Sequence, residues 1–260
     1  MLARLILPAE FGLVAMLAIF MAVSRRICEG GFGAALIQRD RNSHTTECTV
    51  FYCAILTGIL VYAVMYLASP SIARLYNEPI LVPVTRLLAL KFPIGTFGLV
   101  HQVLLKKNLE FRKLTVASSV STLASGIFGI TLALRNYGVW ALVGQQFAYA
   151  CLESCFVWLA CSWRPALRFS FQALKSLGVY AGHFLAASLV STILSNVRLA
   201  LIGFLYPAAV LGFYQRARYL MIVPTETVVQ TIRNVGFPAF SKMQHQRVRL
   251  RSAMFRFIIG

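Results

Sequence analysis

Long apolar runs with almost no charge follow one another through most of this chain, and they constrain its fold more than any other feature. Apolar residues make up 58% of the 260 residues and charged residues only 13%, whereas soluble domains carry about 25% charged residues. A chain this apolar needs lipid as its solvent, and inside lipid only helices and closed barrels satisfy every backbone polar group. The runs show no alternation of period two, so the sequence predicts an all-α, polytopic integral membrane bundle.

The apolar runs divide the chain into seven candidate transmembrane helices and the start of an eighth. Most runs reach the roughly 20 residues that a helix needs to cross a bilayer. Residues 1–7 form a short apolar stub, which we expect to be the tail of a helix whose beginning is missing. The loops are short, so the function is expected within the membrane or at its two faces. The predicted spans cover residues 10–37, 46–69, 80–105, 112–134, 138–161, 174–204 and 208–236, and the eighth begins near residue 248.

Loops rich in Lys and Arg alternate with poor ones along the chain. By the positive-inside rule, we expect the rich loops to be cytoplasmic. The net charge of +17 comes without a nucleic-acid-binding motif, so we attribute it to topology and to contact with anionic lipid headgroups, and we exclude nucleic acid as a partner. The rich loops lie near residues 38–46, 106–113, 162–175 and 241–251.

Ionisable residues within the spans are costly, so each is a candidate functional residue. Guanidinium groups bind phosphate through bidentate, charge-assisted hydrogen bonds, so an excess of arginine over acid in the spans predicts a phosphate-bearing cargo. The candidates for binding a lipid diphosphate are Arg25, Arg26, Arg198, Arg216, Arg218 and Arg233. The alternative is that a guanidinium reaches the headgroups along its own apolar stem. We favour this alternative for Arg86, Arg216 and Arg233.

Acidic residues are scarce in the spans. Glu153 and Glu226 are candidates for binding a coupling proton or sodium ion, and the alternative for each is an ion pair with a neighbouring arginine. His101 and His183 are more typical of packed residues than of a proton relay. The sequence contains no hydrolase or nucleotide-binding motif and no metal-binding pattern of cysteine or histidine. It therefore predicts neither an enzyme nor a bound cofactor.

The first and seventh spans begin and end with similar segments. Residues 7–12 and 206–212 open the two spans, and residues 31–34 and 236–239 close them. Chance similarity between apolar helices is one explanation. A duplication is the other, and it predicts two parallel copies related by an axis along the membrane normal, as in many transporters.

Seven short segments spread in order over the chain carry a family resemblance. They lie at residues 4–16, 33–39, 72–79, 137–143, 163–165, 211–217 and 237–241. Each is weak by itself. Taken together and in this order, they resemble polysaccharide flippases of the multidrug/oligosaccharidyl-lipid/polysaccharide exporter superfamily.

The resemblance implies that the protein carries an undecaprenyl-diphosphate-linked oligosaccharide across the bacterial inner membrane by alternating access, for surface polysaccharide biosynthesis. Two helical lobes would surround a cationic cavity. Residues 1–170 would form the N-terminal lobe, with its first helix incomplete, and residues 171–260 the start of the C-terminal lobe. Residues 25–32 are similar to the second-helix segment of lipid II flippases, which implies that Arg25 or Arg26 contacts the diphosphate. Arg198 stands where many members carry an acid, a departure that puts the coupling role of that acid in doubt.

The implied partners are the lipid-linked oligosaccharide, membrane lipids and proteins of polysaccharide assembly. A cation-coupled multidrug exporter of the same fold is one alternative, but it would need an acidic cavity, and the excess of arginine disfavours it. A membrane-embedded polysaccharide polymerase or ligase is another. It would need a sizeable outward loop to hold the sugar, and the outward loops here are short.

Overall fold

The computed structural model describes residues 6–38 and 43–218, apart from the side chains of residues 179 and 180. All regular secondary structure in this part of the chain is helical, which confirms the predicted all-α class. Residues 208–218 are helical as well. The other helices are α2 (Pro8–Met16), α3 (Ala18–Glu29), α4 (Phe32–Gln38), α5 (His44–Tyr76), α6 (Leu81–Ala89), α7 (Lys91–Lys107), α8 (Phe111–Leu134), α9 (Val139–Ala160) and α10 (Phe171–Leu205).

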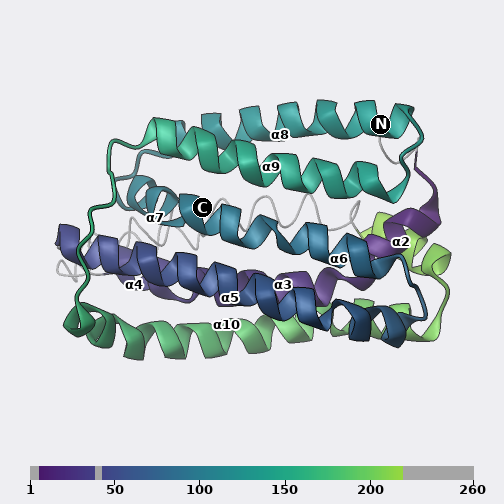
Figure 1. The fold of residues 1–260 in the computed structure, drawn as a ribbon, viewed down its shortest axis with the longest axis horizontal. Helices are drawn as coiled ribbons and strands as arrows, with labels where there is room; N and C mark the ends of the chain where they lie inside the picture. Colours follow the sequence, from purple (N-terminus) through teal and green to yellow (C-terminus); the bar gives the residue numbers. More distant parts are fainter. Residues whose placement is uncertain (1–5, 39–42, 219–260) are drawn as a thin grey trace, which may run out of the picture.

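The helices run along the long axis of one elongated bundle (Figure 1). The antiparallel pair α8 and α9 lies along one side, α10 runs along the opposite side, and α5, α6 and α7 lie between them. α3 packs mainly against α10. α7 contacts α3, α5 and α9, so it is the central helix of the bundle.

Several of the described helices are long and apolar enough to cross a membrane. α5, the α6–α7 segment Leu81–Lys107, α8 and residues Ala181–Leu205 of α10 meet both criteria. The bent pair α2–α3 makes a fifth crossing if it counts as one span. The protein is therefore a multi-pass membrane protein, as predicted.

The helices that meet these criteria differ in two ways from the seven to eight predicted spans. The 22-residue α9 is long enough to cross a bilayer but is not among the qualifying helices, since Gln145, Gln146 and Glu153 lower its mean hydropathy. Most of the predicted span 208–236, and all of the eighth, lie outside the described residues.

The prediction of one continuous helix over residues 10–37 is wrong. This segment is divided into α2, α3 and α4, with a bend of 44° between the first two. Gly30 and Gly31 follow α3 with φ angles of 58° and 68°, in the left-handed region that favours glycine. A β-carbon on Gly31 would also collide with the backbone of Ala181 in α10. The two glycines therefore end α3 and allow α10 to approach it closely.

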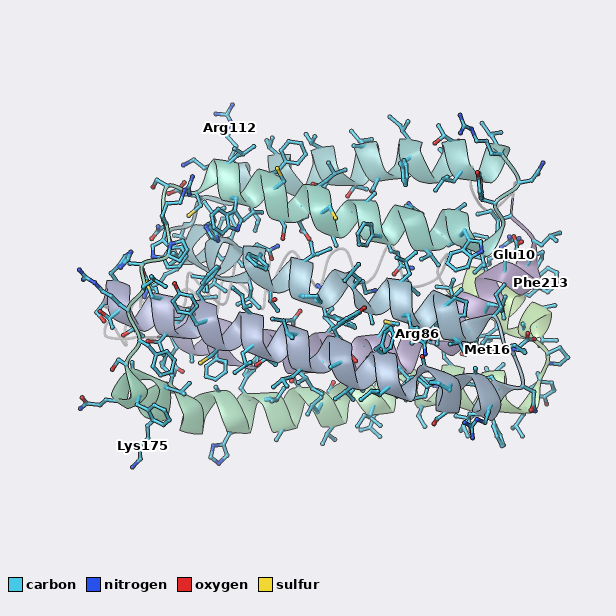
Figure 2. All side chains as sticks on the ribbon, viewed as in Figure 1. Glu10, Met16, Arg86, Arg112, Lys175 and Phe213 are labelled. Atoms are coloured by element: carbon cyan, nitrogen blue, oxygen red, sulfur yellow. The ribbon has the colours of Figure 1, made fainter. Side chains whose placement is uncertain are left out.

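α5 contains Pro70 near its C-terminal end. A proline has no N–H, so the carbonyl of Tyr66 loses its usual helical donor. The Ser69 hydroxyl replaces that donor, with its Oγ 2.7 Å from the Tyr66 oxygen. The Arg86 Nε of α6 donates to the same Ser69 Oγ at 3.1 Å, and its guanidinium lies 4.2 Å from the centre of the Tyr66 ring. Arg86 is thus held against α5 (Figure 2), rather than reaching freely for the headgroups.

The two largest of three apolar clusters among the described residues pack the helices together, one towards each end of the bundle. The first cluster joins α2, α3, α5, α6 and the start of helix 208–218, and the second joins α4, α5, α7, α9 and α10. Members of the first include Met16, Met65, Tyr76, Leu88 and Leu211. Members of the second include Leu36, Phe51, Val100, Leu105 and Val157.

The two segments of the predicted repeat lie against each other. A β-carbon on Gly12 of α2 would collide with the backbone of Ala208, and one on Gly212 would collide with the backbone of Pro8. The contact is reciprocal, because each glycine meets the position four residues before the other. Reciprocity of this kind is the property of an interface with two-fold symmetry. The structure therefore brings the opening segments of the two predicted copies together, while the closing segment 236–239 lies outside the described residues and the duplication stays a prediction.

Three of the four loops predicted to be rich in Lys and Arg gather at one end of the bundle, and the fourth, near residues 241–251, lies outside the described residues. The start of α5, the turn between α7 and α8 and the connection from α9 to α10 lie at the left in Figure 1. The turns from α5 to α6 and from α8 to α9, both poor in these residues, lie at the opposite end. The alternation in the sequence thus corresponds to two distinct ends of the molecule.

Candidate anion-binding site

Two adjacent arginines on α3 share one carboxylate. The Arg25 Nε donates to Oε1 of Glu29 at 3.0 Å, and the Arg26 Nη1 donates to Oε2 of the same residue at 3.0 Å. The i, i+3 and i, i+4 spacings place both pairs on one side of the helix. Glu29 therefore orients both arginines.

Arg26 also connects α3 to α10. Its Nε donates to the Thr192 hydroxyl at 3.2 Å, and that hydroxyl in turn donates to the carbonyl of Ser188. Thr192 is buried between the two helices. Both partners of Arg26 restrain its side chain, so it contributes to packing as well as to charge.

Arg25 has no second hydrogen-bond anchor of this kind among the described residues. Its side chain remains 77% accessible, yet the charges of Lys91 and Lys106 on α7 and of Glu153 on α9 all act on it. The guanidinium therefore lies on an accessible surface that faces the central helices of the bundle.

α9 contributes a polar stripe to the same region. Gln146, Tyr149 and Glu153 are spaced three and four residues apart, which places them on one face of the helix. The Gln146 Oε1 accepts a hydrogen bond from Lys91 Nζ at 3.0 Å, and the Tyr149 hydroxyl donates to Glu153 Oε1 at 2.9 Å. Along α9 the stripe lies between Val143 of the first apolar cluster and Val157 of the second.

These side chains form what we call the interior polar cluster, which draws on α3, α7 and α9. Four cations and two carboxylates leave two positive charges in excess, in a bundle whose other packing contacts are largely apolar. Such an arrangement attracts a dianion and repels a cationic ligand. The cluster consists of Arg25, Arg26, Glu29, Lys91, Lys106, Gln146, Tyr149 and Glu153.

Five of these eight residues were not singled out as binding residues by sequence reasoning. Lys106 belongs to the predicted cytoplasmic loop near residues 106–113, and Glu29 lies within the segment 25–32. The spacing of Gln146, Tyr149 and Glu153 on an otherwise apolar helix is a signal that would have indicated the α9 stripe. No comparable signal relates Lys91 to α3, because 65 residues separate it from Arg26.

The other predicted arginines lie elsewhere among the described residues. Arg216 donates from Nη2 to the Ile6 carbonyl at 2.8 Å and lies 4.5 Å from the Phe11 ring centre, so its role is to hold helix 208–218 against the N-terminal segment. Arg218 donates to the Ser195 carbonyl at 3.3 Å.

Arg198 is exposed on α10 and is joined by no hydrogen bond or ion pair to any described residue. Among the described residues, Arg198 is not one of the charges that act on Arg25 of the interior polar cluster. Arg233 and Glu226 lie outside the described residues. A role for these three residues in binding or coupling stays a prediction.

His101 is fully buried in an aromatic cluster near the Lys- and Arg-rich end of the bundle. Its ring lies 4.4 Å from the Trp158 ring and 5.1 Å from the Trp163 ring, measured between centroids. Within residues 6–38 and 43–218, no group of three His, Cys, Asp or Glu side chains is placed to hold a metal ion. These contacts agree with a packing role for His101.

A cavity of about 480 Å³ opens at the same end of the bundle, next to Lys106 but with none of the residues of the interior polar cluster in its wall. Its wall includes the charged residues Glu47, Lys107, Glu110 and Lys113. The acids and bases in the wall balance, so the cavity offers no excess charge for an anion. We therefore place the candidate site at the interior polar cluster.

A family described as "Polysaccharide biosynthesis protein" matches residues 1–259. The teichuronic acid biosynthesis protein TuaB of Bacillus subtilis is 29% identical over 86% of this chain and 47% of its own length. The succinoglycan biosynthesis transport protein ExoT of Rhizobium meliloti is 24% identical over 97% of the chain and 51% of its own length.

The lipopolysaccharide biosynthesis protein WzxC of Escherichia coli is 26% identical over 99% of the chain and 53% of its own length. The chain thus spans about half the length of these curated relatives. No solved structure matches it significantly.

Proposed function

Because the chain belongs to the polysaccharide biosynthesis protein family, we propose that it takes part in moving a lipid-linked oligosaccharide across the inner membrane. The cargo would be attached to undecaprenyl diphosphate and would serve surface polysaccharide synthesis. Transport would proceed by alternating access, with the site open to one face of the membrane at a time. The Lys- and Arg-rich loops would face the cytoplasm.

The observation that carries this proposal is the excess of positive charge in the interior polar cluster. Each charge within a membrane span costs several kcal/mol unless it is paired or hydrated, by order of magnitude. Lys91, well inside the α6–α7 span, pairs with no carboxylate among the described residues and is therefore unfavourable there without an anion. A diphosphate esterified to a lipid and a sugar carries two negative charges, which match the excess.

The names of the relatives support the class of cargo. Teichuronic acid, succinoglycan and lipopolysaccharide are all surface or secreted saccharides, and ExoT is named as a transport protein. These names favour transport over an enzymatic role. They also favour an oligosaccharide over a cationic drug, which the interior polar cluster would repel. Membrane lipids and polysaccharide assembly proteins would be its partners.

Glu153 is our candidate for coupling transport to a proton or sodium ion. It accepts a hydrogen bond from Tyr149 and forms no ion pair within 4.0 Å with a described residue. The charges of Arg25 and Lys106 act on it. A change in its charge would therefore alter the attraction of the cluster for an anion.

The function is tested by substituting Arg25 in the gene and measuring surface polysaccharide in cells that depend on it. We expect R25A to reduce polysaccharide at least about 10-fold, because losing a charge-assisted contact with phosphate costs at least about 1.4 kcal/mol. Arg112 projects outward from α8 (Figure 2) and provides a matched control, R112A. Normal polysaccharide in R25A cells, with normal amounts of the protein in the membrane, contradicts the proposal.

A further inference from the structure

Lys91 is placed near the middle of the membrane by its position in the α6–α7 span. It is the eleventh residue of the segment Leu81–Lys107, which puts it about 15 Å from the start of the span at 1.5 Å per residue. The hydrocarbon core is about 30 Å thick. An ammonium group at this depth is too far from either face to reach the headgroups along its own stem.

The contacts of Lys91 set it apart from the other cations of the interior polar cluster. Arg25 and Arg26 both pair with Glu29, and Lys106 experiences the negative charges of Glu29 and Glu153. Lys91 instead bonds a neutral amide, the Gln146 Oε1 at 3.0 Å, and lies 5.7 Å from the Phe92 ring centre. The charged residue that acts on it is Arg25, which carries the same sign.

The placement of Lys91 near Arg25 costs electrostatic free energy when no anion is bound, and it becomes favourable when an anion lies between the two. Two like charges repel more strongly within a membrane protein than in water. A lysine ammonium has three N–H donors, and the hydrogen bond to Gln146 uses one of them. An anion between Arg25 on α3 and Lys91 on α7 would accept from both residues and would turn their repulsion into attraction to a common ligand.

We infer that Lys91 is a further anion-binding residue, which together with Arg25 holds the diphosphate of a polyprenyl lipid between α3 and α7. Gln146 is a positioning residue that directs the ammonium from α9. The inference rests on the proposed function for the identity of the lipid, and it adds a residue and a geometry to that site.

The test measures binding of undecaprenyl diphosphate to the purified protein in nanodiscs, by native mass spectrometry. We expect K91M to weaken binding at least about 10-fold and K91R to stay within about threefold of wild type, since an ion pair contact needs the charge. The outward-facing R112M serves as the control for loss of one positive charge, and we expect it to bind as wild type does. Equal binding by K91M and wild type overturns the inference.

Gln146 provides a second variant in case K91M does not fold. Q146L leaves the ammonium in place but removes its orienting partner, so we expect weaker binding with an unchanged melting temperature. The double variant K91M/Q146L should bind no more weakly than K91M, because Gln146 acts through Lys91. Independent, additive losses from the two substitutions contradict the positioning role.

Two competitors identify the source of the anion. Inorganic pyrophosphate should compete only at much higher concentration than the lipid, and phosphatidylglycerol in the nanodisc should not displace it. Displacement by phosphatidylglycerol would overturn the inference in favour of a bulk lipid headgroup. Equal binding by K91M and wild type, with polysaccharide lost in R25A cells, would overturn the inference and leave the proposed function standing. Normal polysaccharide in R25A cells would contradict the proposed function and, with it, the shared diphosphate site at Arg25 and Lys91.

Discussion

Glu29 is the residue that orients the two neighbouring arginines of α3. Each of its carboxylate oxygens bonds a different guanidinium, so one negative charge orients two positive ones. The arginines can then present their remaining N–H groups elsewhere. Without this carboxylate, the excess charge of the interior polar cluster would rise from two to three.

We expect E29Q to lower the thermal unfolding midpoint of the detergent-solubilised protein by about 3–6 °C. Each partly exposed ion pair is worth up to about 1 kcal/mol, and two are lost together. Glu110 pairs with Lys113 alone at the end of the bundle, so E110Q should produce a smaller shift. Equal midpoints for E29Q and wild type would show that the carboxylate does not stabilise the arginine pair.

At the scale of the helix, α5 shows how a proline is tolerated within a span. Pro70 deprives the Tyr66 carbonyl of its donor, the Ser69 hydroxyl supplies another, and Arg86 bonds that hydroxyl from α6. The side chain of Ser69 is fully buried. One hydroxyl therefore repairs the backbone of α5 and anchors α6 to it.

We expect S69A to destabilise the protein by about 1–3 kcal/mol, because it leaves a buried carbonyl and a guanidinium without their partner. Adding P70A should recover part of this loss, since alanine restores the N–H that the Tyr66 carbonyl lacks. The measurement is the unfolding midpoint of the single and double variants. Failure of P70A to improve on S69A would mean that the backbone carbonyl is not the origin of the loss.

The sequence predicts features formed by neighbouring residues better than it predicts contacts between residues far apart in the chain. Hydropathy predicts α5, α8 and α10 well, because each is a continuous apolar run. The arginine pair is recognisable because charge within a span is rare. The sequence does not predict that the charges of Lys91 and Glu153 act on Arg25. These interactions depend on how α3, α7 and α9 pack, and packing of this kind leaves no periodic pattern in the sequence. The break after α3 was missed although two adjacent glycines mark it.

At the scale of the whole molecule, the reciprocal contact of Gly12 and Gly212 joins the N-terminal segment to the helix at 208–218. Each glycine lies against backbone with no room for a side chain. Arg216 strengthens the same junction through the Ile6 carbonyl. Segments about 200 residues apart in the sequence are thereby held together.

We expect G12A to destabilise this junction by at least about 2 kcal/mol, since a methyl group would displace the backbone of Ala208. Gly126 on α8 has open space where its β-carbon would lie, so G126A should be neutral or slightly stabilising. Protease susceptibility of the junction, compared between the two variants, is the measurement. Equal resistance in G12A and G126A would argue that the two segments are not in close contact in the membrane.

Interlocked side chains resist sliding, because each must leave its rotamer before its neighbour can pass. Where the helices cross at Gly12 and Gly212, backbone faces backbone, so no glycine side chain has to leave a rotamer when the helices move. Helix α2 and helix 208–218 can change their crossing angle while they remain in contact. We expect the proposed tilting of residues 171–260 against residues 1–170 to take place about this crossing.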